Sequence, residues 1–257
     1  MREFLEDAFK HQDAGLGRQQ KDRLQDLPKR FYTEVDVVED NGIFAVTLNK
    51  RVAKSPTGKS IMTTNADLAS YMRHEYAAQT THIDPATMPH VRLMNSAIEG
   101  GEEAGPALID EIIKYASNDL LLYRADTPRE LVERQEAVWD AVLVKIARHF
   151  GVSFQPTVGI LHQEQPRETL ARLRATLADL HYVPATAMVS VTGLTGSGLL
   201  AIGLKDKLID ADEAWTAAHV DEDYQISLWG EDYEAAAKRT QRRREFDAAV
   251  NVIRLLA

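Results

Sequence analysis

The sequence has no cysteine among its 257 residues. This absence excludes disulfide-stapled scaffolds, thiolate-ligated zinc, iron–sulfur clusters and cysteine nucleophiles. Stability must therefore come from packing, and the 44% hydrophobic fraction is enough for a sizeable core. The lack of cysteine also fits a reducing compartment.

The sequence has fewer basic than acidic residues: 30 Lys and Arg and 39 Asp and Glu give a formal net charge of −9. Phosphate binding needs a basic surface, so we expect no nucleic-acid partner and no general affinity for anionic membranes. The first ten residues alternate in charge, and the first 17 lack the apolar run of an export signal. Residues 182–204 are uncharged, but Pro184 and four glycines among them favour a helix of a bundle over membrane insertion. We therefore expect a cytoplasmic protein.

Two periodicities divide the chain. Alternating apolar residues on both sides of Asn41-Gly42 predict a β-hairpin within a small antiparallel sheet over residues 31–64, followed by a helix over 65–79 that Asn65 caps. Two prolines in the segment 83–89 indicate a linker. Beyond this segment the 3.6-residue period dominates to the C-terminus.

These patterns predict an α+β protein, in which a small N-terminal antiparallel β domain precedes a larger all-helical domain. The predicted parts are a polar arm over residues 1–28, a β-rich domain with one helix over 29–89, and an α-helical domain over 90–257.

Catalytic and cofactor motifs are scarce. The glycines of 193–198 follow the order G-x-x-G-x-G with no Lys-Ser/Thr after them, so they miss both nucleotide-binding motifs, and they favour close helix packing instead. His74, His82 and His90 recur every eight residues, a spacing that does not place ligands on one helix face. We predict no cofactor, no metal and no enzymatic activity. An enzyme with a site between the two domains stays open, since catalytic groups converge in space.

Charge gathers near the C-terminus in two blocks. Between residues 206 and 234, ten acids face only Lys207. Directly afterwards, five bases fall within residues 238–244. This basic cluster fits the later part of a helix that begins with acids, an arrangement that the helix dipole favours. A patch that contacts nucleic acid or lipid is the alternative.

Within the acidic block, Asp221, Glu222 and Asp223 stand beside Tyr224 and Trp229. Acids next to large aromatics suit a surface that attracts and then holds a basic partner. The same pattern also fits a helix whose aromatics are buried while its acids face water. The residues alone do not separate these two interpretations.

Several segments together resemble the assembly-chaperone family that handles the α subunit of F-type ATP synthase. They follow the family's order and spacing over nearly the whole chain from residue 29. The segments are Lys29-Arg30-Phe31-Tyr32, residues 83–89, Arg92-Leu93 with Asn95, residues 119–124, Arg134-Gln135, Trp139-Asp140, Gln165-Pro166, Asp221-Glu222 with Tyr224-Gln225, and Trp229-Gly230 with Asp232 and Glu234-Ala235. The chain departs from the family at Tyr76, where Trp is frequent, and at Leu122, where Cys is frequent.

The resemblance implies a chaperone that binds the unassembled α subunit and shields its subunit interface until the β subunit replaces it. It also implies a role for an acidic residue near the C-terminus, which by its position corresponds to Glu222. Our hypothesis for the partner-binding residues is Glu222, Asp221, Asp223, Tyr224, Trp229, Asp232 and Glu234. A small-molecule enzyme and a general acidic adaptor for basic partners remain the alternatives.

Overall fold

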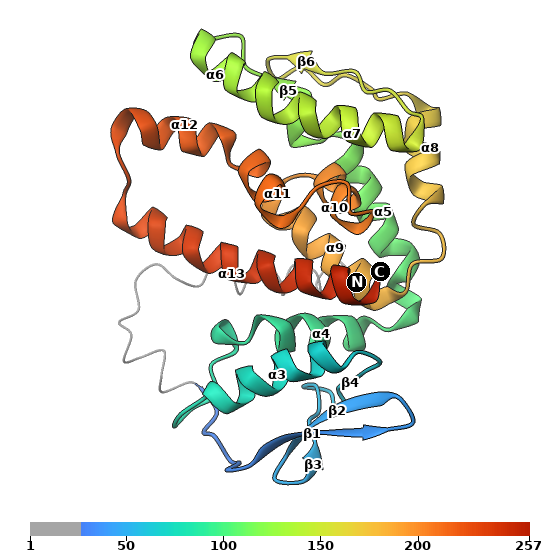
Figure 1. Cartoon of the computed structure of the whole chain (residues 1–257), viewed down its shortest axis with the longest axis vertical. Coiled ribbons are helices and arrows are strands. Elements are labelled where there is room, and N and C mark those ends of the chain that lie inside the picture. The colour runs from blue at the N-terminus through green and yellow to red at the C-terminus, as the bar shows by residue number, and fades with distance from the viewer. Residues whose placement is uncertain (1–26) are drawn as a thin grey trace. The chain divides into compact units, whose positions relative to one another are not determined.

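The computed structural model describes residues 27–257 (Figure 1). The arm predicted over residues 1–28 therefore lies almost entirely outside the described part of the chain. The structure divides into two compact units, residues 1–99 and residues 100–257. A small antiparallel sheet lies in the first unit and helices make up most of the second, so the predicted α+β class is confirmed.

The sheet of the first unit is built around its second strand. Its strands are β1 (Val35–Asp40), β2 (Ile43–Leu48), β3 (Arg51–Val52) and β4 (Met62–Thr63), and β2 pairs antiparallel with each of the other three. Asn41 and Gly42 join β1 to β2 with φ angles of 52° and 79°, which is the backbone that an Asn-Gly hairpin turn requires. The predicted hairpin is confirmed.

Helix α3 (Ala66–Ala78) packs on this sheet. The Asn65 side chain accepts hydrogen bonds from the backbone N–H groups of Asp67 and Leu68, so it is the predicted N-cap. Leu68 and Met72 are buried on one face of the helix. The apolar period of this short segment thus sets which face covers the sheet.

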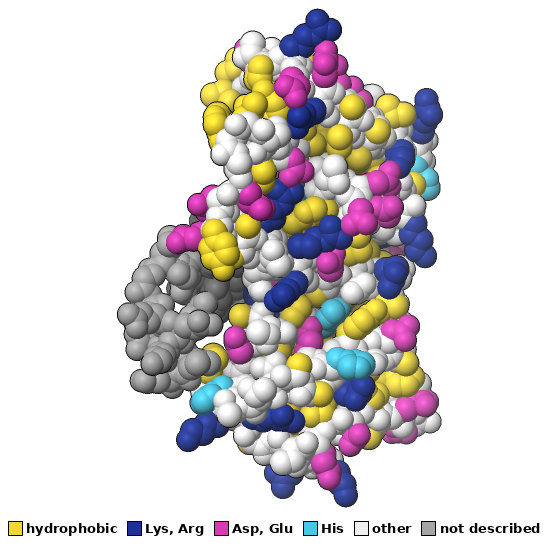
Figure 2. Space-filling model, turned by 60° about the vertical axis from the view of Figure 1, so that its left-hand side comes forward, with side chains coloured by type: hydrophobic (Ala, Val, Ile, Leu, Met, Phe, Trp, Pro, Cys, Tyr) yellow, Lys and Arg dark blue, Asp and Glu magenta, His cyan; other side chains and the backbone are white. Residues whose placement is uncertain are grey.

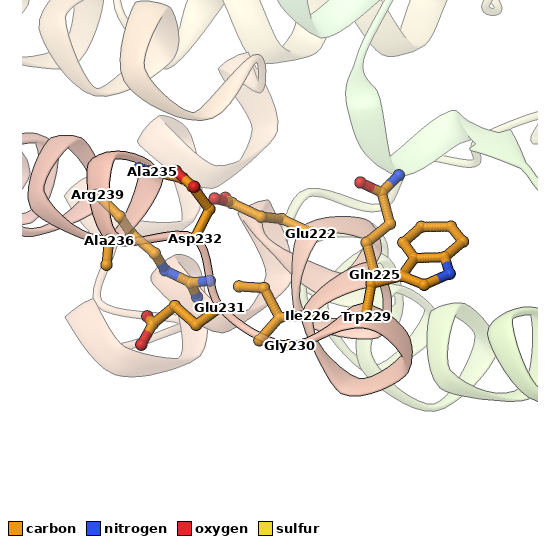
Figure 3. A pocket seen from close by; sticks show the side chains of 10 residues that line it. All are labelled: Glu222, Gln225, Ile226, Trp229, Gly230, Glu231, Asp232, Ala235, Ala236 and Arg239. Atoms are coloured by element: carbon orange, nitrogen blue, oxygen red, sulfur yellow. Dashed lines mark hydrogen bonds between the residues drawn. The ribbon is translucent and has the colours of Figure 1, made fainter.

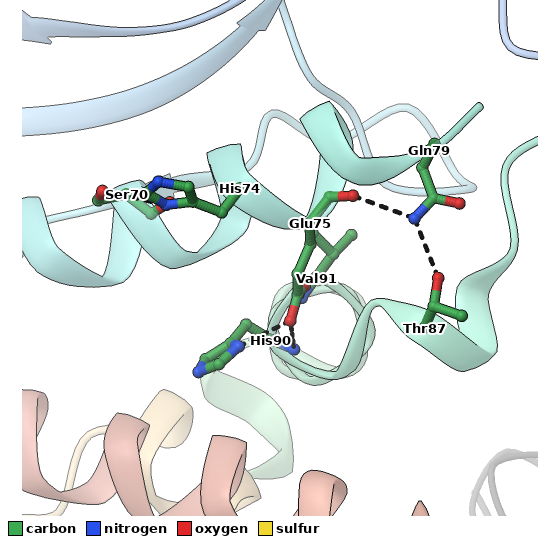
Figure 4. A network of polar contacts seen from close by, with 7 residues as sticks. All are labelled: Ser70, His74, Glu75, Gln79, Thr87, His90 and Val91. Atoms are coloured by element: carbon green, nitrogen blue, oxygen red, sulfur yellow. Dashed lines mark hydrogen bonds and ion pairs between the residues drawn. The ribbon is translucent and has the colours of Figure 1, made fainter.

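The proline-containing segment does not connect the two units. It forms a short helix η1 (Pro85–Thr87) and opens helix α4 (Pro89–Gly100). The Glu75 carboxylate of α3 accepts the backbone N–H groups of His90 and Val91, both at 2.9 Å, and lies 2.7 Å from His90 Nδ1 (Figure 4). Gln79 Nε2 donates to Thr87 Oγ1 at 3.0 Å. Because α3 caps α4 in this way, α4 belongs to the first unit, which runs to residue 99 and so extends ten residues past the predicted domain end at residue 89.

The second unit contains most of the helices. Its elements in chain order are η2 (Glu102–Ala104), α5 (Gly105–Ser117), η3 (Leu120–Leu122), β5 (Tyr123–Arg124), α6 (Arg129–Gln135), the π-helix η4 (Glu136–Asp140), α7 (Ala141–Phe150), β6 (Thr157–Val158), α8 (Arg167–Ala175), α9 (Tyr182–Thr195), α10 (Gly198–Lys205), α11 (Ala211–Ala218), α12 (Val220–Trp229) and α13 (Tyr233–Leu256). Helix α9 is central, because α5, α10 and α13 all pack against it.

The uncharged segment 182–204 is two helices and not one. Helix α9 ends at Gly196, which adopts a left-handed φ of 71°, and Ser197 caps α10 by accepting the Leu200 N–H. At Gly198 an added Cβ would lie 2.3 Å from the Ile112 carbonyl oxygen and 2.7 Å from the Ala116 nitrogen. The backbones of α10 and α5 therefore touch, which confirms that the small residues here serve close packing.

Asp119 lies fully buried beside this contact. Its carboxylate accepts the backbone N–H groups of Leu121 at 3.1 Å and Leu199 at 2.9 Å. Burial raises the pKa of Asp119 to about 7, although these hydrogen bonds and one from the Ser197 hydroxyl act in the opposite direction. A buried acid with several donors thus joins the segment after α5 to the start of α10.

Candidate functional site

Helices α12 and α13 form a helical hairpin at one side of the second unit (Figure 1). Gly230 ends α12 with a φ of 82°, and Asp232 caps α13 by accepting the Ala235 N–H at 2.9 Å. The acidic block of the sequence therefore supplies the first turns of both helices, where the helix dipole stabilises negative charge. The helix dipole thus explains why acids lie in the first turns of these helices, but it does not explain why there are so many of them.

A groove of about 240 Å³ lies between α12 and the first half of α13 (Figure 3). Ile226 and the alanines of α13 supply apolar surface, and acids from both helices and the turn supply charge. The lining residues are Glu222, Gln225, Ile226, Trp229, Gly230, Glu231, Asp232, Ala235, Ala236 and Arg239. In Figure 3 the Trp229 indole lies at one end of the lining and points away from the other labelled side chains, while Asp232 and Arg239 lie at the other end.

Large apolar side chains face solvent where the two helices meet. We name Leu228, Trp229 and Tyr233 the hairpin tip. Trp229 is 78% exposed and Tyr233 is 86% exposed, and Leu228 is also exposed. Figure 2 shows hydrophobic and acidic side chains next to each other on this side of the molecule. Exposed aromatics next to each other are typical of surfaces that bind a partner.

Three acids around the tip are not neutralised by Lys or Arg. Among the described residues, no ion pair involves Glu231 or Glu234, and Glu222 has only the His219 ring, with Nε2 at 3.8 Å from its carboxylate. His219 is buried, and burial lowers its pKa, so it is mainly neutral near pH 7. Its Nδ1 lies 2.7 Å from the Trp215 carbonyl oxygen, which fixes the ring. The negative charge of these acids is thus available to a partner.

Three of the seven predicted partner-binding residues have side chains that contact other parts of this chain. Tyr224 is 7% exposed, and the Arg134 guanidinium lies 5.1 Å from its ring centroid. Asp221 accepts a hydrogen bond from Gln135 Nε2 at 2.7 Å. Asp223 pairs with Arg239 at 2.5 Å. The helical period turns these side chains towards α6 and α13, so they help to position α12, and the Asp223 side chain is at the same time 43% exposed.

The other four predicted residues, Glu222, Trp229, Asp232 and Glu234, lie at or beside the groove. Sequence reasoning missed Leu228, Tyr233 and Glu231. Tyr233 could have been found, because it follows Trp229 by four residues and also stands next to acids, which is the pattern that singled out Trp229.

The basic cluster of residues 238–244 is largely used inside the chain. Besides the Asp223 partner of Arg239, Arg243 contacts Asp212 at 2.6 Å and Asp247 at 2.7 Å, and Arg242 donates to the Leu194 carbonyl at 2.5 Å. These contacts account for Arg239, Arg242 and Arg243 without nucleic acid or lipid, whereas Lys238 and Arg244 are exposed. In addition, no described helix is long and apolar enough to span a membrane, and the described residues include no group of three or more acids or histidines placed to hold a metal.

Comparisons with known proteins bear on this geometry. A family model described as ATP12 chaperone protein matches residues 29–147. The mitochondrial protein atp12 of Schizosaccharomyces pombe is 22% identical over 216 residues, which cover 79% of this chain and 74% of that protein.

Two crystal structures match almost from end to end. The Atu1473 protein of Agrobacterium tumefaciens is 35% identical with a TM-score of 0.85, over 99% of this chain and 98% of that one. Atp12 from Paracoccus denitrificans is 30% identical with a TM-score of 0.80, over 90% of this chain and 99% of that one. The match to the family model ends before α12, so the hairpin tip lies outside the segment that this model covers.

Proposed function

Because the chain belongs to the ATP12 chaperone family, a family of ATP synthase assembly chaperones, we propose that it binds the unassembled α subunit of F-type ATP synthase. In this proposal the chaperone shields the subunit interface of α until the β subunit replaces it, and it does so without catalysis. The observation that carries the proposal is the hairpin tip, where exposed aromatics stand among acids that lack basic partners.

The chemistry of the tip suits a temporary complex. An unassembled subunit exposes an interface that is meant to be buried, and such a surface aggregates. A holder must cover this surface and later release it, which favours a charged, wet contact with a few anchors over a large apolar one. Trp229 and Tyr233 can supply the anchors, and the acids can attract a basic surface from a distance.

The residues divide into two roles. We assign Glu222 as the central partner contact, with Trp229, Asp232 and Glu234 beside it, and we add Tyr233 and Glu231. Asp221, Asp223 and Tyr224 instead hold α12 in place through Gln135, Arg239 and Arg134. We therefore expect substitutions in the first group to weaken binding by removing contacts with the partner. Substitutions in the second group should weaken binding only by moving α12.

Exposed aromatics and acids favour a protein partner here. Cavity size does not decide the matter, because the groove of about 240 Å³ is below the roughly 300 to 1,000 Å³ of small-molecule sites, and a second hollow of about 430 Å³ beside Tyr233 is within that range. The cytoplasmic location stays a prediction, and the S. pombe relative is named as mitochondrial.

The direct test is to refold the isolated α subunit of the same organism's ATP synthase with and without this protein, following light scattering and then size-exclusion elution. We expect lower scattering and co-elution with α. The isolated β subunit and an unrelated basic protein are the matched controls, and neither should co-elute. Unchanged scattering of α without co-elution contradicts the proposal, and co-elution with every basic protein would show a general adaptor instead.

A further inference from the structure

His219 lies at the junction of α11 and α12, where its ring is held in one orientation. The residue is 3% exposed, and its Nδ1 lies 2.7 Å from the Trp215 carbonyl oxygen. The imidazole also packs on the Trp215 indole, with 3.9 Å between the ring centroids, and that indole packs on Phe246 of α13. The ring is therefore fixed to the core, because turning it would break both a hydrogen bond and a ring contact.

The hydrogen bond to Trp215 decides which nitrogen of His219 can take up a proton. A carbonyl oxygen only accepts, so Nδ1 carries the hydrogen of the neutral ring and Nε2 is left as the base. Glu222 Oε2 lies 3.8 Å from Nε2, and this is the one ionic contact of His219 with the described residues. A proton bound at Nε2 would turn this loose approach into a shorter, charge-assisted hydrogen bond.

The start of α12 places Glu222 beside the ring. The Asp223 N–H donates to the His219 carbonyl oxygen at 2.8 Å, so the helix begins at the histidine, and residues three apart on a helix are neighbours. The His219 side chain is 3% exposed and the Glu222 side chain is 37% exposed. The pair therefore runs from the core to the groove, and a change of charge at His219 acts directly on a groove acid.

The surroundings of His219 keep Nε2 without a proton near neutral pH. Burial lowers the pKa of His219, and the guanidinium groups of Arg239 and Arg242 on α13 act in the same direction, whereas the Trp215 carbonyl and Glu222 oppose them. A neutral ring does not form an ion pair. Glu222 therefore has no charged partner among the described residues at pH 7.

The other elements that pack on α11 contribute neutral or already paired groups. η3 consists of three leucines, and η4 contributes the Trp139 indole, whose Nε1 donates to the Ala217 carbonyl oxygen at 2.7 Å. The charged side chains that pair elsewhere in η4, α10 and α13 are Asp140 with Arg124, Lys205 with Asp206, and Arg243 with Asp212 and Asp247. Glu222 is thus the acid that His219 can pair with.

We propose that His219 is a positioning residue for Glu222 and that it links partner binding to pH. With a neutral ring, the Glu222 side chain stays at the groove and is available to the partner. A proton at Nε2 draws the carboxylate towards the ring and adds a positive charge beside the contact with a basic partner, so both effects weaken the complex in acid. The role of Glu222 in binding rests on the proposed function, whereas its coupling to His219 is a property of the free chain.

The first test follows the whole protein alone by NMR between pH 8 and pH 5. The ring ¹⁵N signals of His219 report the proton at Nε2, and the side-chain ¹³Cδ signal of Glu222 reports its surroundings. We expect the Glu222 signal to move at the midpoint of the His219 titration, which should lie below the ordinary value of 6.5. Glu234 at the start of α13 is the control and should not move at that midpoint. A Glu222 signal that ignores the His219 titration would overturn the inference.

The second test measures the Kd for the α subunit at pH 7.5 and pH 5.0. Acidification should raise the Kd of the wild type at least about three-fold more than that of His219→Asn. Asparagine can still donate to the Trp215 carbonyl but takes up no proton. His149→Asn, which removes an exposed histidine from α7, is the matched control and should keep the pH dependence of the wild type. The same pH dependence in the wild type and in folded His219→Asn would overturn the link to binding.

The two tests separate this inference from the proposed function. The NMR titration needs neither a partner nor a variant, so it decides the coupling even if His219→Asn does not fold. If Glu222 follows His219 but α co-elutes at neither pH, the positioning role stands and the assigned partner is wrong. If α co-elutes but Glu222 does not follow His219, the proposed function stands and the positioning role is wrong.

Discussion

Acidic side chains occupy two very different places in the second unit. Asp119 is fully buried, and backbone N–H groups and a hydroxyl surround its carboxylate. Glu222, Glu231 and Glu234 lie around an exposed groove and tip, and no Lys or Arg of the described residues pairs with them. Apolar residues show the same contrast, because Leu199 and Leu200 of α10 are buried while Leu228 and Trp229 of α12 face solvent.

The contrast separates folding from function. A buried polar group must have its hydrogen bonds made, since an unmade one reduces stability. Around Asp119 this requirement is met, so this region needs nothing from outside the chain. At the hairpin tip the protein leaves aromatic surface and charge without internal partners, which gains no stability in the free chain and is useful only in a complex. Substitutions in the first region should therefore change unfolding, and those in the second should change binding.

The largest effect is expected from Gly198→Ala. The new methyl group would lie 2.3 Å from the Ile112 carbonyl oxygen, so α10 or α5 must move, and we expect a loss of about 4 kcal/mol or more in the free energy of unfolding. Urea denaturation measures the loss. Gly203→Ala in the same helix is the matched control, because its Cβ meets side-chain atoms and no backbone, Ile209 at 3.1 Å and Ile146 at 3.6 Å, and it should cost about 1 kcal/mol. Equal losses would contradict the close approach of α10 and α5.

Asp119 should give the protein a particular pH dependence. Burial raises its pKa in the folded state to about 7 from the ordinary 3.8, so the folded protein holds a proton that the unfolded chain releases. Its contribution to stability is complete below about pH 4 and is lost as pH rises through 7, at roughly 1 kcal/mol per pH unit. Asp119→Asn should remove this slope, which urea denaturation at pH 5, 6, 7 and 8 would reveal. An identical slope in the variant would show that Asp119 stays ionised.

Glu222→Lys should separate binding from stability. A lysine in the groove opposes the basic partner, so we expect complex formation with the α subunit to weaken by at least about 2 kcal/mol in binding free energy. Helical content and Tm should change little, because Glu222 makes no closer ionic contact than 3.8 Å to His219. Size-exclusion co-elution, circular dichroism and thermal melts check this. Normal binding by the variant would remove Glu222 from the site.

Trp229→Ala should have a smaller but still clear effect. Loss of an anchoring indole should weaken binding by roughly 2 kcal/mol, whereas the free energy of unfolding should stay within about 0.5 kcal/mol because the side chain is exposed. Val144→Ala on α7 is the control for removal of an exposed apolar side chain, and it should change neither quantity. If both variants bind equally well, the hairpin tip is not an anchor.

The sequence predicted the elements whose signals are local. Asn41-Gly42 marks a hairpin and Asn65 caps a helix, because each acts on its immediate neighbours. It failed where distant residues decide. Helix α4 joins the first unit through the Glu75 carboxylate of another helix, and the parallel pair of β5 with β6 joins segments that lie more than 30 residues apart.

The residue types of the candidate site could be predicted from the sequence, but the directions of their side chains could not. The acids and aromatics of residues 221–234 were identified together, since charge and size are visible in sequence. Which of them face outward depends on the helices that pack against α12. Tyr224 contacts the Arg134 guanidinium because α6 packs against α12, and Asp223 pairs with Arg239 because α13 lies next to α12 in the hairpin.

The central claim is that the hairpin tip and its groove are covered by the α subunit while the Asp119 region is not. Hydrogen–deuterium exchange of the protein alone and in complex with α tests both regions in one experiment. We predict slower exchange in peptides that span residues 222–239 and unchanged exchange in those that span 195–204. Protection elsewhere in the chain, with none over residues 222–239, would contradict the account.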